Sequence, residues 1–281
     1  MEHRDIPLQA VDRVKHPFTL QQFTEEYVNR RRPVVIRTRS LADLGWHTDR
    51  WTEDYLVEKA GQTRVIVQFK SGDWFGTRET GQDKIRMPFE QFVRVVMKNE
   101  KGHKTWYLNI QTLQRVLDPP LLQLQGDFNV PEYFDGHAVR WISLWMGHNP
   151  GAYNRSQLHN DNHDNLYAVI RGRKHFTIFA PQDGHNLYTR GRIREILDDG
   201  RVMYEETGDQ FLPQFSRVDV ENIDLEQFPL AADATPHEAD LEENDMLFLP
   251  AGWYHDVRSY GKNIAMNFWA DPPGSERPQH A

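Results

Sequence analysis

The sequence contains no cysteine among its 281 residues. This absence excludes both a disulfide scaffold and a thiolate metal site, so any metal ion must be bound by nitrogen and oxygen ligands. No apolar run approaches the roughly 18 residues that a membrane-spanning helix needs. The first residues, MEHRDIPLQAVDRV, also lack the apolar segment of a secretory signal. We therefore expect an intracellular, cytoplasmic protein with no membrane partner.

Basic residues are not in excess either. The chain has 33 Lys and Arg against 41 Asp and Glu, which gives a net charge of −8. A nucleic-acid partner is therefore not expected, whereas a basic protein or peptide partner stays open. The content of hydrophobic residues, 38% with eight tryptophans, allows a sizeable core, and the length favours one domain over two.

The first third of the chain has helical patterns. Thr19 and Gln22 have the spacing of a capping box, and they predict a helix that ends before Pro33. Further helices are predicted near 51–59 and 87–96, and the intervening apolar runs VVIR and RVIVQF predict strands.

From Trp106 onward the pattern changes to short β-type segments separated by Gly, Pro and Asn. These segments are TWYLNIQ, HAVRWISLWMG, NLYAVI, KHFTIF, DMLFLP, DVRS and NIAMNFWA. We predict a single mainly β domain over 1–281, in which a double-stranded β-helix (jelly-roll) core at 105–270 follows an N-terminal α/β cap at 1–104. The polar stretch 182–240 is predicted to be an insertion in the core, of the kind that often forms binding loops.

The stretch HNDNHD, which begins at His159, supplies candidate metal ligands. His159 and Asp161 are two residues apart, so on an extended chain they point to the same side. His255 in LPAGWYHDVRS is the best candidate for a third ligand. Two histidines and one carboxylate form the facial triad of non-haem Fe(II) oxygenases, which leaves positions for co-substrate and dioxygen. The His159–His163 spacing would suit zinc on a helix, but the β-type run that follows disfavours a helix there.

Lys174 is a candidate binding residue for a co-substrate. An Fe(II) oxygenase that splits dioxygen needs two further electrons, and 2-oxoglutarate supplies them by oxidative decarboxylation. The site must then bind a dicarboxylate. Lys174 opens the apolar strand KHFTIF, where an unpaired ammonium would be costly. An exposed lysine in the preceding turn is the alternative interpretation.

The segments HND, NLY, GRKHF, AP, LFLPAGWYH and NFW, in this order, resemble those of the JmjC (cupin-8 type) Fe(II)- and 2-oxoglutarate-dependent hydroxylases. The resemblance extends from about Ile6 to Trp269. It is closer to the lysyl hydroxylases of that family than to the asparaginyl hydroxylases. Asn160 departs from the lysyl hydroxylases, which have lysine there, and the loop Glu-Asn-Asp at 243–245 replaces the commoner turn glycine.

The resemblance implies a role for each matching residue. His159, Asp161 and His255 would bind Fe(II) and form the catalytic centre, and Lys174 would pair with the distal carboxylate of 2-oxoglutarate. The remaining co-substrate contacts that it implies are Tyr107, Ser156, Asn165 and Asn267. Ser156 stands where relatives often have threonine, so the hydroxyl group is kept.

The resemblance further implies a dioxygenase that hydroxylates an amino-acid side chain, lysine favoured, in a protein or peptide, and releases succinate and CO2. Two alternatives stay open: an N-methyl-lysine demethylase, and a metal-binding cupin without enzymatic activity. Lys174 and Tyr107 argue against the second, because a mere metal binder has no need of a dicarboxylate site. Candidate walls of the substrate pocket are Trp145, Trp253 and Tyr254. Many relatives dimerise, so a homodimer also stays open.

Overall fold

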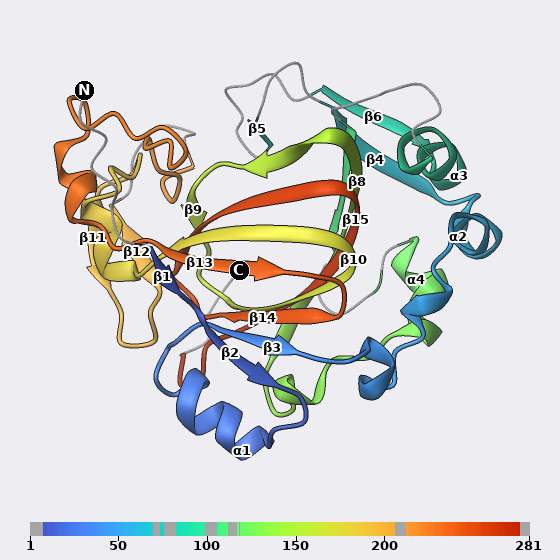
Figure 1. The fold of residues 1–281 in the computed structure, drawn as a ribbon, viewed down its shortest axis with the longest axis horizontal. Helices are drawn as coiled ribbons and strands as arrows, with labels where there is room; N and C mark the ends of the chain where they lie inside the picture. The colour runs from blue at the N-terminus through green and yellow to red at the C-terminus, as the bar shows by residue number, and fades with distance from the viewer. Residues whose placement is uncertain are drawn as a thin grey trace.

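The structure, a computed structural model, describes residues 8–69, 74–75, 83–98, 106–111, 117, 119–205 and 212–275. Thirteen of the described strands join one mixed sheet that curls around itself, and two more form a small separate ribbon (Figure 1). The large sheet contains β1 (Gln9–Ala10), β2 (Asp12–Lys15), β3 (Val34–Arg37), β4 (Arg64–Phe69), β5 (Trp74–Phe75), β6 (Asp83–Pro88), β7 (Trp106–Gln111), β8 (Val139–Ser156), β9 (His159–Asn160), β10 (Asp164–Phe179), β13 (His237–Leu241), β14 (Asp245–Leu249) and β15 (Tyr254–Ala270). The ribbon pairs β11 (Ile193–Ile196) with β12 (Val202–Tyr204).

Short helices surround the sheet. They are α1 (Leu20–Phe23), α2 (Glu53–Ala60), α3 (Phe89–Phe92) and α4 (Leu121–Leu124), with π-helical turns at Thr24–Val28 and Val93–Met97 that continue α1 and α3. Single 3-10 turns occupy Leu41–Leu44, Thr48–Arg50, Gln125–Asp127, Glu132–Phe134, Pro181–His185 and Pro229–Asp233. The predicted capping box is present: the Thr19 side chain accepts from the backbone of Gln22, whose own side chain accepts from the Thr19 backbone. Within the described residues no helix is long and apolar enough to cross a membrane.

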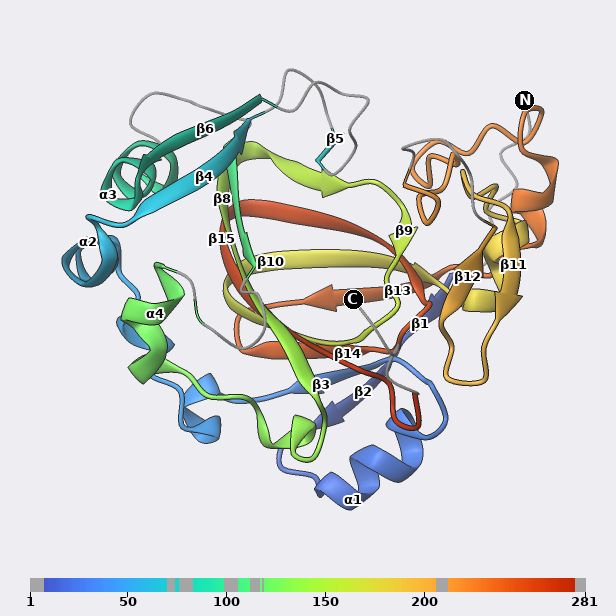
Figure 2. The same ribbon diagram turned by 180° about the vertical axis from the view of Figure 1, so that it is seen from behind.

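The three longest strands, β8, β10 and β15, lie side by side at the centre of the sheet (Figures 1 and 2). Strands β14, β3 and β2 extend the sheet beyond β10, and β7, β4 and β6 extend it beyond β8. This arrangement confirms the predicted jelly-roll core with helical additions.

Two pairs of predicted short strands are continuous strands in the structure. NLYAVI and KHFTIF both lie in β10, which has 16 residues, and DVRS and NIAMNFWA both lie in the 17-residue β15. Gly172 lies between the two predicted segments NLYAVI and KHFTIF, where the pairing of β10 with β15 is irregular. Gly172 has a φ of +82°, and a Cβ there would meet the carbonyl oxygen of Lys262 at 2.4 Å. The glycine therefore lets two long strands bend together without a turn.

The two faces of β10 belong to different cores. Leu166 and Ala168 pack in the larger cluster, which also contains aromatic residues of the helical cap such as Trp46 and Phe89. Because side chains alternate along a strand, Tyr167 and Val169 point to the opposite face, the inside of the roll, where a second cluster also contains Phe176, Ile178 and Leu247. Polar side chains that enter this inner face are held in a largely apolar surrounding.

The predicted insertion lies on the edge of the roll beside β9 and β13 (Figure 1). It contains the ribbon of β11 and β12 and two of the 3-10 turns. Its predicted end at residue 240 falls inside β13, which pairs with β10 from Lys174↔Leu241 to Ile178↔His237. The last residues of the predicted insertion are therefore part of the core sheet, because HEADL continues the alternation of a strand with Ala239 and Leu241 buried.

Candidate active site

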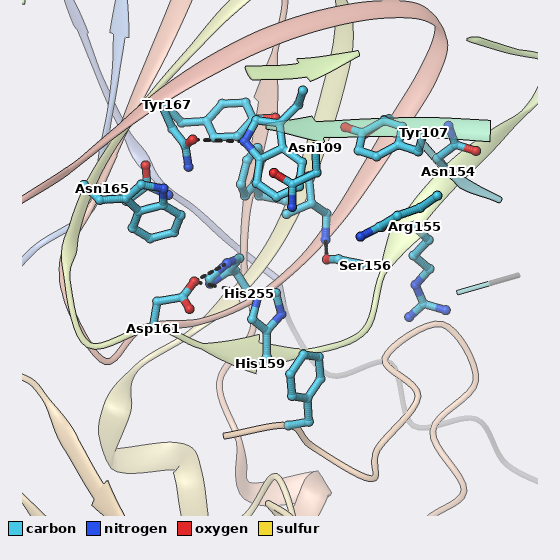
Figure 3. A pocket seen from close by; sticks show the side chains of 18 residues that line it. Tyr107, Asn109, Asn154, Arg155, Ser156, His159, Asp161, Asn165, Tyr167 and His255 are labelled. Atoms are coloured by element: carbon cyan, nitrogen blue, oxygen red, sulfur yellow. Dashed lines mark hydrogen bonds and ion pairs between the residues drawn. The ribbon is translucent and has the colours of Figure 1, made fainter. Parts of the chain in front are cut away.

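Strand pairing brings three candidate metal ligands together at one end of the roll. Strand β9 pairs antiparallel with β15, and His159 lies directly opposite His255. Directly opposed residues share a face, and the two ring centroids are 4.4 Å apart. Asp161 lies beyond His159, with Oδ2 at 3.7 Å from His159 Nε2 and 3.6 Å from His255 Nε2 (Figure 3). Ligand atoms of all three residues lie within 4.8 Å of one another, so one ion can contact all of them.

Both histidines are oriented for metal binding by their second ring nitrogen. His159 Nδ1 lies 2.6 Å from the carbonyl oxygen of Gln157, and His255 Nδ1 lies 3.1 Å from that of Trp253. A carbonyl oxygen only accepts, so each Nδ1 carries the proton and each Nε2 presents its lone pair toward Asp161. Burial, reinforced by the neighbouring His159, lowers the pKa of His255 to about 4, so this ring is neutral near pH 7. Two imidazoles and a carboxylate are a donor set that suits a divalent transition metal.

The loops that carry these ligands are fastened to each other by an ion pair. Asp164 is fully buried and accepts two hydrogen bonds from the guanidinium of Arg31, one of them from Nη1 at 2.9 Å. Asp164 Oδ1 also accepts from the backbone N–H of Ala251 at 2.9 Å. The next backbone N–H, of Gly252, donates to the carbonyl oxygen of Asp161 at 2.7 Å. Asp164 therefore connects the loop of Asp161 to the turn that leads into His255, and Arg31 supplies the counter-ion of this buried carboxylate.

A buried lysine lies farther along the inner face. Lys174 on β10 is fully buried and lies opposite Ser259 on β15. Its Nζ donates to Ser259 Oγ at 2.5 Å, Tyr107 Oη at 2.8 Å and Asn263 Oδ1 at 3.0 Å. All three acceptors are neutral, and burial lowers the pKa of Lys174 to about 7. A buried ammonium with neutral partners gains stability from an anionic ligand.

Between the metal-ligand group and the neighbours of Lys174 lies a cavity of about 210 Å³ (Figure 3). His159, Asp161 and His255 line it, and so do five of the residues predicted to contact co-substrate or substrate: Tyr107, Ser156, Asn165, Asn267 and Trp145. Lys174 itself is not among the described lining residues. The cavity thus joins a candidate metal site to Tyr107 and Ser259, the two lining hydroxyls that accept hydrogen bonds from the buried Lys174.

Three of the polar lining residues have defined surroundings. The Ser156 hydroxyl accepts from the backbone N–H of Val257 at 2.9 Å, which leaves its own proton to donate. The indole N–H of Trp145 donates to Asn267 Oδ1 at 2.9 Å and fixes that amide. Asn165 Oδ1 is buried and has no hydrogen-bond partner within the described residues. A buried acceptor of this kind is typical of a site that a ligand completes.

The structure places two predicted pocket residues elsewhere. Tyr254 precedes His255 on β15, so its side chain points to the other face, where its hydroxyl lies 3.0 Å from that of Tyr204. The Trp253 indole donates to the carbonyl oxygen of Arg31 at 3.0 Å and supports the ion pair described above. Neither is among the described residues that line this cavity, so their place in the substrate pocket stays a prediction.

The sequence pattern did not single out Ser259, Asn263 or Phe215. For Ser259 a signal existed: His255, Val257 and Ser259 alternate along one strand and therefore share a face. Asn263 lies beyond the bend of β15 at Gly261, where this alternation is interrupted. Phe215 comes from the insertion and lines the cavity through a contact that sequence spacing cannot reveal.

The chain is similar to known proteins over nearly its whole length. Residues 20–276 match the model of the cupin-like domain. The tRNA wybutosine-synthesizing protein 5 of Gallus gallus is 27% identical over 97% of this chain and 81% of its own length. The bifunctional peptidase and (3S)-lysyl hydroxylase JMJD7 of Homo sapiens is 30% identical over 95% of this chain and 85% of its own length. The lysine-specific demethylase JMJ30 of Arabidopsis thaliana is 28% identical over 89% of this chain and 52% of its own length.

Arg31→Ala is expected to lower the free energy of unfolding by about 3–5 kcal/mol, because it leaves the fully buried Asp164 without its counter-ion. The matched control is Arg32→Ala, which breaks an ion pair with Asp12 in which both side chains are about half exposed. Arg32→Ala should lower the free energy of unfolding by less than about 1 kcal/mol. Urea denaturation monitored by tryptophan fluorescence measures both, and equal losses in the two variants would contradict the role given to Arg31.

Proposed function

The chain belongs to the cupin-like domain family, and we propose that it is an oxygenase that hydroxylates an amino-acid side chain, lysine favoured, in a protein or peptide. Enzymes of this family use Fe(II), 2-oxoglutarate and dioxygen. The observation that carries the proposal is one cavity with His159, Asp161 and His255 at one end and the hydroxyls around the buried Lys174 at the other.

The metal-binding role rests on the donor set. His159 Nε2, His255 Nε2 and an oxygen of Asp161 would bind Fe(II) from one side, and the bound metal and co-substrate supply the oxidising power for C–H hydroxylation. The carbonyl oxygens that accept from both Nδ1 atoms hold the rings in the tautomer that ligates. Asp164, paired with Arg31, holds the loop of Asp161 against the turn that precedes His255.

The co-substrate would be oriented by the chain's own polar groups. Lys174 would pair with the distal carboxylate of 2-oxoglutarate, to which the Tyr107 hydroxyl would donate. The Ser156 hydroxyl, whose oxygen accepts from Val257, would donate to the same carboxylate. Asn165 and Asn267 would bind nearer the metal, where the unpaired Asn165 oxygen and the amide fixed by Trp145 line the cavity. Hydrophobic walls such as Tyr167 and Phe176 keep water away from these contacts.

The substrate class is supported by the lysyl hydroxylase JMJD7, which is the 30% identical relative. The names of two other relatives state other activities. One relative takes part in the synthesis of a modified nucleoside of tRNA, and the other demethylates lysine. A metal-binding cupin without activity is disfavoured by Lys174, because a buried lysine held by three neutral acceptors has no purpose in a simple metal carrier.

Purified protein with Fe(II) and 2-oxoglutarate should form succinate, and His159→Ala should abolish it. Lys174→Ala should raise the KM for 2-oxoglutarate by about 10- to 100-fold, the value of one charge-assisted contact. Lys262→Ala is the matched control, because that lysine pairs with Glu53 outside the cavity. Its KM should equal that of the wild type. Equal succinate formation by wild type, His159→Ala and Lys174→Ala would end the oxygenase proposal.

The affinity for 2-oxoglutarate should fall as pH rises above about 7. Burial lowers the pKa of Lys174 to about 7 in the free protein, so above this pH the lysine must regain a proton when the dicarboxylate binds. The dissociation constant then rises by up to about tenfold per pH unit until the pKa of the complex is reached. Anaerobic calorimetric titration between about pH 6 and 9 measures this.

Lys174→Arg is the control for the pH profile, since a guanidinium keeps its charge throughout this range. The slope should disappear in this variant even where its affinity is lower. A flat profile for the wild type would contradict the lowered pKa of Lys174 in the free protein, whereas the KM of Lys174→Ala tests its pairing with the co-substrate.

The substrate itself can be identified in extracts treated with wild-type protein or with His159→Ala. Peptide mass spectrometry should reveal a gain of one oxygen atom on a lysine residue in the wild-type sample alone. The same extracts provide tRNA for nucleoside analysis. A new modified nucleoside with no change in any peptide would contradict the protein substrate, and loss of a methyl group from lysine would favour demethylation instead.

A further inference from the structure

The insertion supplies an aromatic side chain that contacts a candidate metal ligand directly. Phe215 is 6% exposed and lines the same cavity as His159 and Asp161. Its ring lies against the His159 imidazole with a centroid distance of 4.9 Å and an interplanar angle of 11°, which is an offset parallel stack. One face of the His159 ring is therefore covered by a residue from a segment about 55 positions later.

Backbone pairing fixes this contact. Phe215 forms a β-bridge with His159. On either side of it, the N–H of Ser216 donates to the Leu158 carbonyl oxygen at 2.9 Å, and the N–H of Asn160 donates to that of Gln214 at 3.3 Å. The segment around Phe215 thus lies along the edge of β9 that β15 leaves free. Phe215, His159 and His255 form one row across three adjacent stretches of chain.

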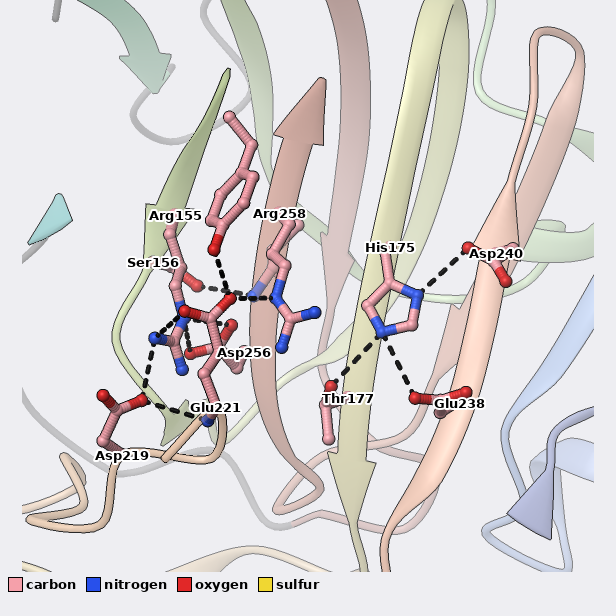
Figure 4. A network of polar contacts seen from close by, with 12 residues as sticks. Arg155, Ser156, His175, Thr177, Asp219, Glu221, Glu238, Asp240, Asp256 and Arg258 are labelled. Atoms are coloured by element: carbon pink, nitrogen blue, oxygen red, sulfur yellow. Dashed lines mark hydrogen bonds and ion pairs between the residues drawn. The ribbon is translucent and has the colours of Figure 1, made fainter. Parts of the chain in front are cut away.

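The chain that follows Phe215 is attached to the roll by ion pairs (Figure 4). Arg155, only 3% exposed, lies with Nη1 at 2.8 Å from Asp219 and 2.9 Å from Glu221, while its Nε donates to the fully buried Asp256 at 2.9 Å. Arg258 Nε lies 2.7 Å from the other oxygen of Glu221. The Arg155–Asp256 pair is buried and fixes the guanidinium within the roll, and this guanidinium then meets the partly exposed carboxylates of Asp219 and Glu221. The insertion is therefore held at a defined position relative to β8 and β15.

The two contacts of the His159 ring constrain different motions. The hydrogen bond from Nδ1 to the Gln157 carbonyl oxygen opposes rotation of the ring about its bond to Cβ. The stack with Phe215 opposes tilting of the ring plane out of the row. Together they aim Nε2 at the point that Asp161 and His255 also face.

We propose that Phe215 is a positioning residue that fixes the His159 imidazole in its ligating orientation, so that the insertion completes the metal site. This inference rests on the metal-binding role proposed above. Its consequence is that metal affinity depends on a residue that contacts no metal and lies outside the jelly-roll core.

The test compares Phe215→Leu and Phe215→Tyr with Phe228→Leu. Phe228 is the matched control, because it lies in the same insertion and packs on Tyr188, at 5.1 Å between centroids, away from the metal ligands. Mn(II) affinity of the metal-free protein is measured by electron paramagnetic resonance, and the Co(II) absorption spectrum reports ligand geometry. Phe215→Leu should weaken Mn(II) binding by about tenfold and alter the Co(II) spectrum. Phe215→Tyr, which keeps a stacking ring, and Phe228→Leu should match the wild type.

Thermal unfolding midpoints, measured on the same samples, separate loss of positioning from loss of folding. A Phe215→Leu protein with wild-type Mn(II) affinity and Co(II) spectrum would overturn the inference, and so would an equal loss in Phe228→Leu. Neither outcome contradicts the proposed metal site, provided that Asp161→Ala abolishes Mn(II) binding. A wild-type protein that binds no Mn(II), or an Asp161→Ala variant that binds it normally, would overturn the metal site and this inference together.

Discussion

The register between β9 and β15 is the constraint on which the site depends. It places His159 opposite His255, and a slip of one residue would turn one of the two side chains to the other face. The same strand β15 continues to Ser259, opposite Lys174 on β10. Four residues of extended chain separate His255 from Ser259, which corresponds to about 13 Å. One strand therefore sets the distance between the metal ligands and the buried ammonium. A five-carbon dicarboxylate, together with the side chains that bind its two ends, can span this distance.

Contacts from outside the jelly-roll core maintain this register. Arg31, from the turn after the first helix, holds Asp164 and through it the turn that leads into His255. Phe215, from the insertion, holds the opposite edge of β9. The metal-ligand group is thus enclosed between two segments that are far from it in sequence.

Local patterns in the sequence predicted the fold class and the helices of the cap, because capping boxes and alternation are short-range signals. The spacing of His159 and Asp161 predicted that the two side chains share a face, and the structure brings His255 to them. Patterning could not show that β10 runs through Gly172 without a turn, since a glycine can either end a strand or bend it. Tyr254 follows the metal-ligand pattern in sequence but lies on the other face of β15 from His255, because proximity in sequence to a ligand does not specify the face of a strand. The stack of Phe215 on His159 depends on where a long insertion folds back, which has no local signature.

The central claim is that one ion is bound by His159, Asp161 and His255 together. Anomalous diffraction at the iron absorption edge, from crystals grown anaerobically with Fe(II), tests it most directly. The account predicts a single strong peak within coordination distance of Nε2 of both histidines and of a carboxylate oxygen of Asp161. A peak that contacts other residues, or no peak where these three side chains meet, would contradict it.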